Sequence, residues 1–113
     1  MSRVFVVQQP ARYDYAAGGF VPKYDLSPAR SHGDLIFLLG PGNIFKDRMK
    51  KAREDLRAKL ADFSPDDMIL AVGDPVAIAL TVMFASEHTG GRLNFLKWDR
   101  KAAAYELYTV NTH

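Results

Sequence analysis

The chain has 113 residues, of which 48% are hydrophobic and 25% charged, so its composition is that of one ordinary globular domain over residues 1–113. It contains no cysteine, which excludes disulfides, cysteine-ligated zinc clusters and thiol nucleophiles. The net charge of +2 permits an acidic partner without requiring one. The N-terminal apolar run is too short for a signal peptide, and no stretch approaches the roughly 20 apolar residues that span a bilayer. We therefore expect a cytoplasmic protein without a membrane partner.

The first predicted element is a buried strand over residues 4–7, because Val-Phe-Val-Val is a continuous run of β-branched and aromatic residues that ends before Pro10. Residues 12–25 then place Gly18-Gly19 between aromatic residues, a pattern typical of a hairpin. Pro22 lacks the N–H that an inner strand needs, so the returning strand is predicted to lie at an edge. The N-terminal part of the chain thus predicts a strand followed by a hairpin-like excursion.

A single helical turn is predicted over residues 27–33, and a second buried strand follows over residues 35–39. Residues 44–63 give the clearest helical pattern, because their apolar side chains recur at spacings of three and four: Phe45, Met49, Ala52, Leu56, Leu60 and Phe63. Asn43 is predicted to cap this helix. On its exposed face, opposite charges four residues apart are expected to pair: Asp47 with Lys51, Lys51 with Asp55, and Asp55 with Lys59.

A third buried strand is predicted over residues 68–72, followed by a helix from Pro75 to about His88. Asp74 is suited to cap this second helix, with Pro75 at its first position. Two strands over residues 92–98 and 105–110 complete the chain as a hairpin. Strands that alternate with two helices predict an α/β domain: a small, mostly parallel sheet with a β-α-β-α-β core and an antiparallel C-terminal hairpin. The order of the strands stays open.

Ligands of such sheets bind beyond the carboxyl ends of the strands, where the loops of residues 40–43 and 73–75 are expected to lie. The candidate ligand-binding residues there are Gly40, Gly42, Asn43, Gly73 and Asp74. Neither loop matches a phosphate-binding or dinucleotide fingerprint, and Asp74 would repel an anion. Capping and turn formation therefore explain these residues better than a nucleotide-handling site does.

Basic residues suggest a second interpretation, in which the helix of residues 44–63 and the final hairpin bind nucleic acid. The candidates are Lys50, Arg53, Arg57, Arg92, Lys97 and Arg100, with aromatic residues beside those of the hairpin. Acidic residues interleave with the positive charges of the helix, and that pattern is typical of a solvated, salt-bridged face. The aromatic residues likewise suit packing between the two strands.

No pattern in the sequence indicates catalysis. The acidic residues and histidines follow no order typical of a catalytic triad and no metal-ligand spacing, so we expect no catalytic residue, no metal and no cofactor. The helix after Pro75 is different, because its body carries Thr81 as its one polar residue over 76–85. A helix that is apolar all round needs cover on more than one side, which either a central place in the core or a second copy of the chain would provide.

Short turn and cap motifs carry a resemblance to a known group of proteins: Asp25-Leu26-Ser27-Pro28-Ala29, Leu60-Ala61-Asp62-Phe63, Val72-Gly73-Asp74-Pro75, Gly90-Gly91-Arg92-Leu93 and Trp98-Asp99-Arg100. With these motifs the chain resembles short uncharacterised proteins encoded in the genomes of tailed phages and prophages. The resemblance implies an accessory protein acting in the cytoplasm of the bacterial host, and it implies no activity. The interpretation that combines these observations is a small non-catalytic interaction module that forms a homodimer and binds another protein.

Overall fold

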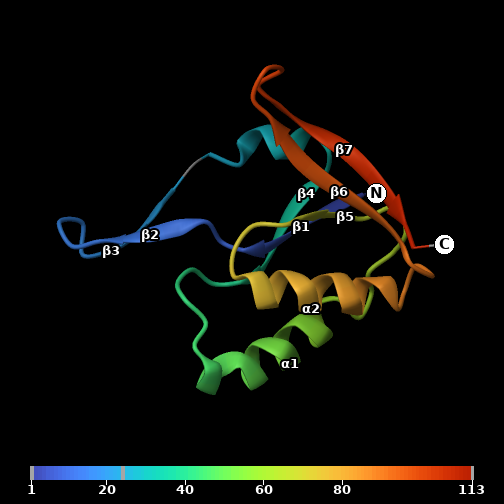
Figure 1. Ribbon diagram of the computed structural model, residues 1–113. Coiled ribbons are helices and arrows are strands. Elements are labelled where there is room, and N and C mark those ends of the chain that lie inside the picture. The colour runs from blue at the N-terminus through green and yellow to red at the C-terminus, as the bar shows by residue number, and fades with distance from the viewer. Residues whose placement is uncertain (1, 24, 113) are drawn as a thin grey trace.

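The computed structural model describes residues 2–23 and 25–112. The chain forms a main sheet of five strands, a separate two-stranded arm and two α-helices (Figure 1). Their bounds are β1 (Arg3–Gln8), β2 (Ala11–Asp14), β3 (Gly19–Pro22), the 3₁₀-helix η1 (Ser27–Ser31), β4 (Asp34–Leu39), the 3₁₀-helix η2 (Lys46–Arg48), α1 (Met49–Lys59), β5 (Met68–Leu70), α2 (Pro75–Ser86), β6 (Arg92–Asp99) and β7 (Ala104–Asn111).

The main sheet has the strand order β4-β1-β5-β6-β7. β1 lies between β4 and β5 and is parallel to both, β5 is parallel to β6, and β7 returns antiparallel to β6. The predicted α/β class, the mostly parallel sheet and the antiparallel C-terminal hairpin are therefore confirmed. The strand order, which the sequence left open, places the N-terminal strand β1 near the middle of the sheet.

Two apolar layers hold the sheet, one on each face. α1 and α2 cover one face, as Figure 1 shows, and there Leu56 and Phe84 pack against inward side chains such as Phe5. Val4 and Val6, which alternate with Phe5 along β1, point to the other face of the sheet. There they pack beneath η1, together with Leu26 and Ala29. The near-continuous apolar run of β1 thus follows from a strand that is buried on both faces.

The first helix differs from its prediction. α1 begins at Met49 and not at Ile44, because Phe45 is extended (φ −79°, ψ 162°) and η2 forms the turn between them. Asn43 consequently does not cap a helix. Of the predicted charge pairs, Lys51 and Asp55 lie 3.4 Å apart. Lys59 instead donates to the main-chain carbonyl of Leu38, on the outer edge of β4, at 2.7 Å.

The second helix begins as predicted. The Asp74 side chain accepts the N–H groups of Val76 and Ala77 at 2.8 and 3.1 Å, and Pro75 occupies the first turn. α2 ends at Ser86, two residues before the predicted end. β5 is also shorter than predicted, since it ends at Leu70. Among the residues that the structure describes, no helix is long and apolar enough to cross a membrane.

Candidate functional site

The carboxyl ends of β1, β4 and β5 meet at one edge of the sheet, and the two predicted loops lie there side by side. A pocket of about 560 Å³ opens at this edge. Of the predicted ligand-binding residues, Gly42, Asn43, Gly73 and Asp74 line it, while Gly40 lines an adjoining depression with Gly42 and Asn43. The sequence therefore placed these five residues in one neighbourhood correctly.

Gln8, the last residue of β1, connects the two loops and was not singled out from the sequence. Its side chain is 5% exposed. Its Nε2 donates to the carbonyl of Gly40 at 3.1 Å and to that of Gly42, and its Oε1 accepts the N–H of Asp74 at 2.9 Å. One buried amide thus satisfies polar groups from both loops at once, which is how a buried polar side chain is tolerated.

The backbone of Gly73 is shaped by this contact. Its φ is +119°, and a Cβ built on it would lie 2.5 Å from the Cβ of Gln8 and 2.7 Å from Oε1 of Gln8. The glycine is therefore required by both its conformation and the close approach of Gln8. This requirement gives Gly73 a structural role at the pocket edge.

The pocket combines polar, aromatic and charged side chains. Arg12, Tyr13, Phe20 and Lys23 come from the arm and its base and line the pocket together with Asp74. The first N–H groups of α2, which would otherwise attract an anion, are taken by Asp74, and both ends of the Gln8 amide are bonded internally. The polar groups that hold the pocket together are thus engaged within the protein.

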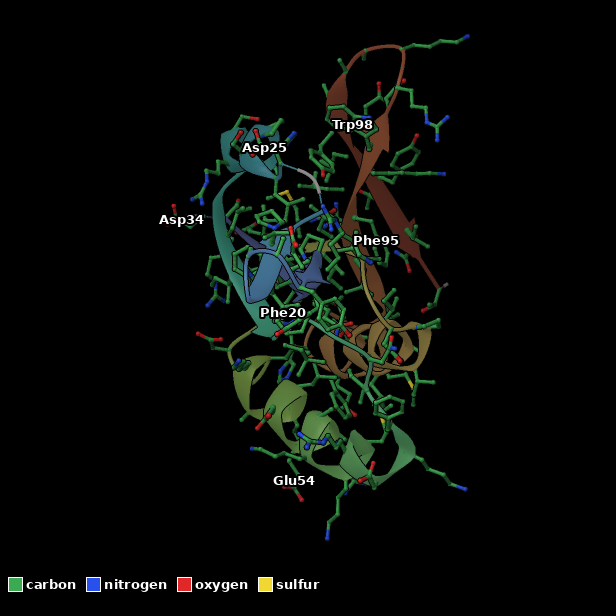
Figure 2. The ribbon with its side chains drawn as sticks, turned by 90° about the vertical axis from the view of Figure 1, so that its left-hand side faces the viewer. Phe20, Asp25, Asp34, Glu54, Phe95 and Trp98 are labelled. Atoms are coloured by element: carbon green, nitrogen blue, oxygen red, sulfur yellow. The ribbon has the colours of Figure 1, made fainter. Side chains whose placement is uncertain are left out.

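The predicted nucleic-acid residues are spread over separate parts of the molecule. Lys50, Arg53 and Arg57 lie on α1, whereas Arg92 begins β6, Lys97 lies near the end of that strand and Arg100 lies in the turn that follows it. Figure 2 shows this separation, since Glu54 of α1 and Trp98 of the hairpin lie at opposite ends of the view. The structure therefore does not join the two groups into one basic surface.

Within the α1 group, Arg57 differs from Lys50 and Arg53. Its guanidinium lies 4.3 Å from the ring centroid of Phe84 and 3.7 Å from the Glu87 carboxylate. We expect the Lys50→Glu/Arg53→Glu variant to keep its free energy of unfolding within about 0.5 kcal/mol of the parent, because surface charges rarely contribute more. Arg57→Glu should lose about 1 kcal/mol, since it removes the ring contact and repels Glu87.

Urea denaturation followed by circular dichroism measures both values. The double variant is then the suitable probe of nucleic-acid binding, because its folding is unaffected. A loss of several kcal/mol in the double variant would contradict this assignment of Lys50 and Arg53 to a solvated face.

A larger groove, of about 910 Å³, lies along the C-terminal hairpin. It exists because β5 has three residues and β6 has eight, so the hairpin extends beyond its neighbour in the sheet. Its lining is mostly apolar and includes Phe95, Trp98 and Tyr105, with the rings of the last two 5.0 Å apart. Sequence reasoning assigned these aromatic residues to packing between strands and missed the groove, whose cause is the unequal length of two strands.

The arm formed by β2 and β3 is the predicted hairpin, but side-chain patterns did not reveal that it stands apart from the main sheet. Its strands pair with each other and not with the main sheet, and Figure 1 shows them projecting from the body. Tyr13 lies edge-on to both Tyr15 and Phe20, with centroids 4.8 and 5.5 Å apart. Tyr13 and Phe20 are about half exposed, and Tyr15 is 90% exposed. The predicted hairpin is thus confirmed, with an aromatic cluster at the surface.

An ion pair between the buried Asp67 and the partly exposed Arg3 fixes the opposite end of β1. Arg3 donates to both carboxylate oxygens of Asp67, at 3.2 and 2.7 Å, and to Asp62 at 2.9 Å. Burial alone raises the pKa of Asp67, but hydrogen bonds from the Arg3 side chain and from the N–H groups of Ser64 and Arg3 outweigh it, so this pKa lies below its ordinary value. The hydrogen-bonding groups of Arg3 and Asp67 are thus satisfied within the protein, and we assign this ion pair a structural role.

Comparison with known proteins adds one match. The family model described as Phage Pam3 gp32-like protein matches residues 2–112. No curated protein and no solved structure matches the chain. The match covers nearly the whole chain and confirms the resemblance to phage-encoded proteins that the turn and cap motifs indicated.

Proposed function

The chain belongs to the phage Pam3 gp32-like family, and we propose that it is a non-catalytic interaction module that associates with itself and binds another protein. The observation that carries the proposal is the β2–β3 arm. The proposal also retains the expectation that the protein acts in the bacterial cytoplasm.

The arm supports binding to a protein because of what it exposes. A two-stranded hairpin with few contacts to its surroundings is marginally stable in water, and aromatic side chains that gather at a surface are typical of protein interfaces. Here Tyr13, Tyr15 and Phe20 form one cluster on a ribbon that stands away from the sheet. Tyrosine supplies a large contact area at low conformational cost, since its ring has few rotatable bonds. Such an arm suits insertion into a groove of a partner.

Self-association is supported by two further apolar surfaces. On α2, Ala77, Thr81 and Phe84 are buried, so this helix belongs to the core, yet Val76 and Met83 on its other side remain more than half exposed. On β7, Leu107, Tyr108 and Val110 are exposed as well. Large apolar side chains that stay exposed on a small chain are candidates for contact with a second molecule.

The arm can be tested by affinity capture from a bacterial lysate, followed by mass spectrometry. Proteins retained by the parent chain should be lost with Tyr13→Ser/Tyr15→Ser, because the aromatic contact area is removed. They should be retained by Arg12→Ser, which changes an exposed residue of the same arm, and they should survive nuclease treatment. Neither variant should lower the free energy of unfolding by more than about 0.5 kcal/mol, since the altered side chains are exposed.

Two outcomes would count against the proposal. Equal retention by the parent chain and by the double tyrosine variant would show that the arm is not the binding element. Retention that disappears after nuclease treatment would instead favour nucleic acid as the partner. Self-association is measured separately, by sedimentation of the purified chain over a range of concentrations.

A further inference from the structure

β7 forms one edge of the main sheet, and its backbone determines what could bind there. It runs over eight residues, Ala104–Asn111, and pairs on one side with β6. Beyond its first two residues every position is exposed. An edge strand of this length presents a row of main-chain donors and acceptors to any extended chain that approaches it.

The register identifies which groups point outward. Thr112 donates its N–H to the carbonyl of Gly91 at 3.2 Å, so the even-numbered residues of β7 direct their main-chain groups toward β6. The odd-numbered residues, 105 to 111, direct theirs away from the sheet. The carbonyl of Tyr105 is one of these, and it accepts a hydrogen bond from Nε2 of His32 at 3.0 Å. Leu107 and Thr109 are the outward residues in the exposed part of the strand.

The side chains of β7 do not protect this edge. Edge strands of monomeric proteins are usually blocked by lysine, proline, a bulge or a covering element. Within β7, Glu106 is the one charged residue and there is no lysine or proline. The exposed side chains that flank Leu107 and Thr109 are Tyr108 and Val110, which suit contact with another strand.

We propose that β7 pairs antiparallel with β7 of a second copy of this chain, about a two-fold axis at Tyr108, so that two sheets become one. This inference rests on the self-association in the proposed function and specifies its surface. In this register Leu107 lies opposite Thr109 of the second copy, and the two exchange both main-chain hydrogen bonds, twice by symmetry. The carbonyl of Tyr105 keeps His32 as its partner, so the pairing ends where Glu106 lies opposite Val110 and does not extend to Asn111 of the second copy.

Side chains fit the same register. Tyr108 lies opposite its own copy at a position without hydrogen bonds, where side chains approach most closely, and paired aromatic rings stabilise such positions. Val110 of each copy lies opposite Glu106 of the other, so no like charges are brought together. A different extended peptide could use the same edge, but it would lack this symmetric match.

The absence of cysteine from the chain makes a direct test possible. At a non-hydrogen-bonded antiparallel pair the two Cα atoms are about 4.5 Å apart, within the range of a disulfide. Under mild oxidation, Tyr108→Cys should therefore form a covalent dimer in high yield. Val110→Cys is the matched control: it is an exposed residue of the same strand, but its two copies are four pairs apart in this register, and it should remain at the background level of cross-linking.

A second pair of variants tests the register without oxidation. Leu107→Lys/Thr109→Lys brings lysines together twice across the axis, and it should weaken the dimer by about tenfold or more in sedimentation. Leu107→Lys/Thr109→Glu makes the same number of changes but opposes unlike charges, and it should preserve the dimer. Circular dichroism of the monomeric form confirms that both variants fold.

The outcomes separate this inference from the proposed function. A parent chain that sediments as a monomer at every concentration overturns both the self-association and the edge. The parent chain could instead self-associate while Tyr108→Cys gives no more cross-linking than Val110→Cys. That result would overturn the β7 pairing and leave the self-association standing. Equal weakening of the dimer by the two double variants would likewise exclude the Tyr108-centred register.

Discussion

Asp67→Asn is expected to lower the free energy of unfolding by about 3 kcal/mol. The Asp67 side chain is 1% exposed, and it accepts hydrogen bonds from Nε and Nη2 of Arg3 and from the N–H of Ser64. Removing one partner of a buried ion pair costs about 3–5 kcal/mol, because the other charge stays behind without full compensation. The expected loss lies at the lower end, since the Arg3 side chain is 27% exposed and keeps its contact with Asp62. Urea denaturation followed by circular dichroism measures it.

Asp62→Asn is the matched control for this prediction. The Asp62 side chain binds the same guanidinium at 2.9 Å, but it is 74% exposed, so its loss should cost less than about 1 kcal/mol. Equal effects of the two substitutions would contradict the view that burial makes the Asp67 contact the important one. Arg3 itself is less informative, because its replacement removes both contacts together.

The contribution of Asp67 should also depend on pH in a defined direction. Because its pKa is lower in the folded protein than in the unfolded chain, its stabilising effect is complete above the unfolded value of about 3.9. It is lost as the pH falls through the lower, folded value. The difference in stability between the parent chain and Asp67→Asn should therefore shrink below about pH 4. A difference that stays constant down to acid unfolding would contradict this linkage.

Gly73→Ala is the second change with a large expected effect, about 3 kcal/mol or more. The residue has a φ of +119°, which costs a non-glycine residue about 1–3 kcal/mol. The new Cβ would also lie 2.5 Å from the Cβ of Gln8, and an atom attached directly to the backbone of β1 cannot rotate away. Relief of such overpacking costs about another 1–3 kcal/mol. Thermal and urea unfolding both report the loss.

Gly18→Ala separates these two contributions. Gly18, in the turn of the arm, has a φ of +72°, but nothing lies within 4 Å of the position that a Cβ would take. Its replacement should therefore cost about 1 kcal/mol, from backbone conformation alone. If both alanine variants lost the same amount, the contact with Gln8 would not be the reason that position 73 needs glycine. The result also bears on ligand studies, because a bulky residue at Gly73 would disturb folding before it tested any binding.

The sequence predicted the fold well where local chemistry decides it. Asp74-Pro75 set the start of α2, and the apolar run of β1 marked a strand buried on both faces. The run of residues 35–39 also marked a strand, but the prediction that it is buried was wrong, because β4 lies at the edge of the sheet and Leu38 is its one buried residue. The start of α1 was missed because the apolar spacing continues through Phe45, which is 64% exposed and lies in an extended segment. A helical period does not distinguish a core side chain from an exposed one of the same kind.

The candidate sites also divide into features that local sequence patterns predict and features that depend on tertiary structure. The meeting of the two loops follows from the rule that parallel strands end at one edge, so it was predictable. The role of Gln8 in joining the two loops was not predictable. A glutamine after a predicted buried strand is usually exposed, and the loops that it bonds lie far away in the chain. The hairpin groove and the open edge of β7 depend on strand lengths and strand order, and these are tertiary properties that local patterns do not specify.

The hydrogen bond from Lys59 to the carbonyl of Leu38 affects how many copies can assemble. If both edges of the sheet were open, chains could add one after another and grow into a fibril of indefinite length. The amino group of Lys59 occupies an outward acceptor of β4, the far edge, and places a positive charge beside it. A pair of chains joined through β7 would therefore present a β4 edge at each end, and growth would stop at two.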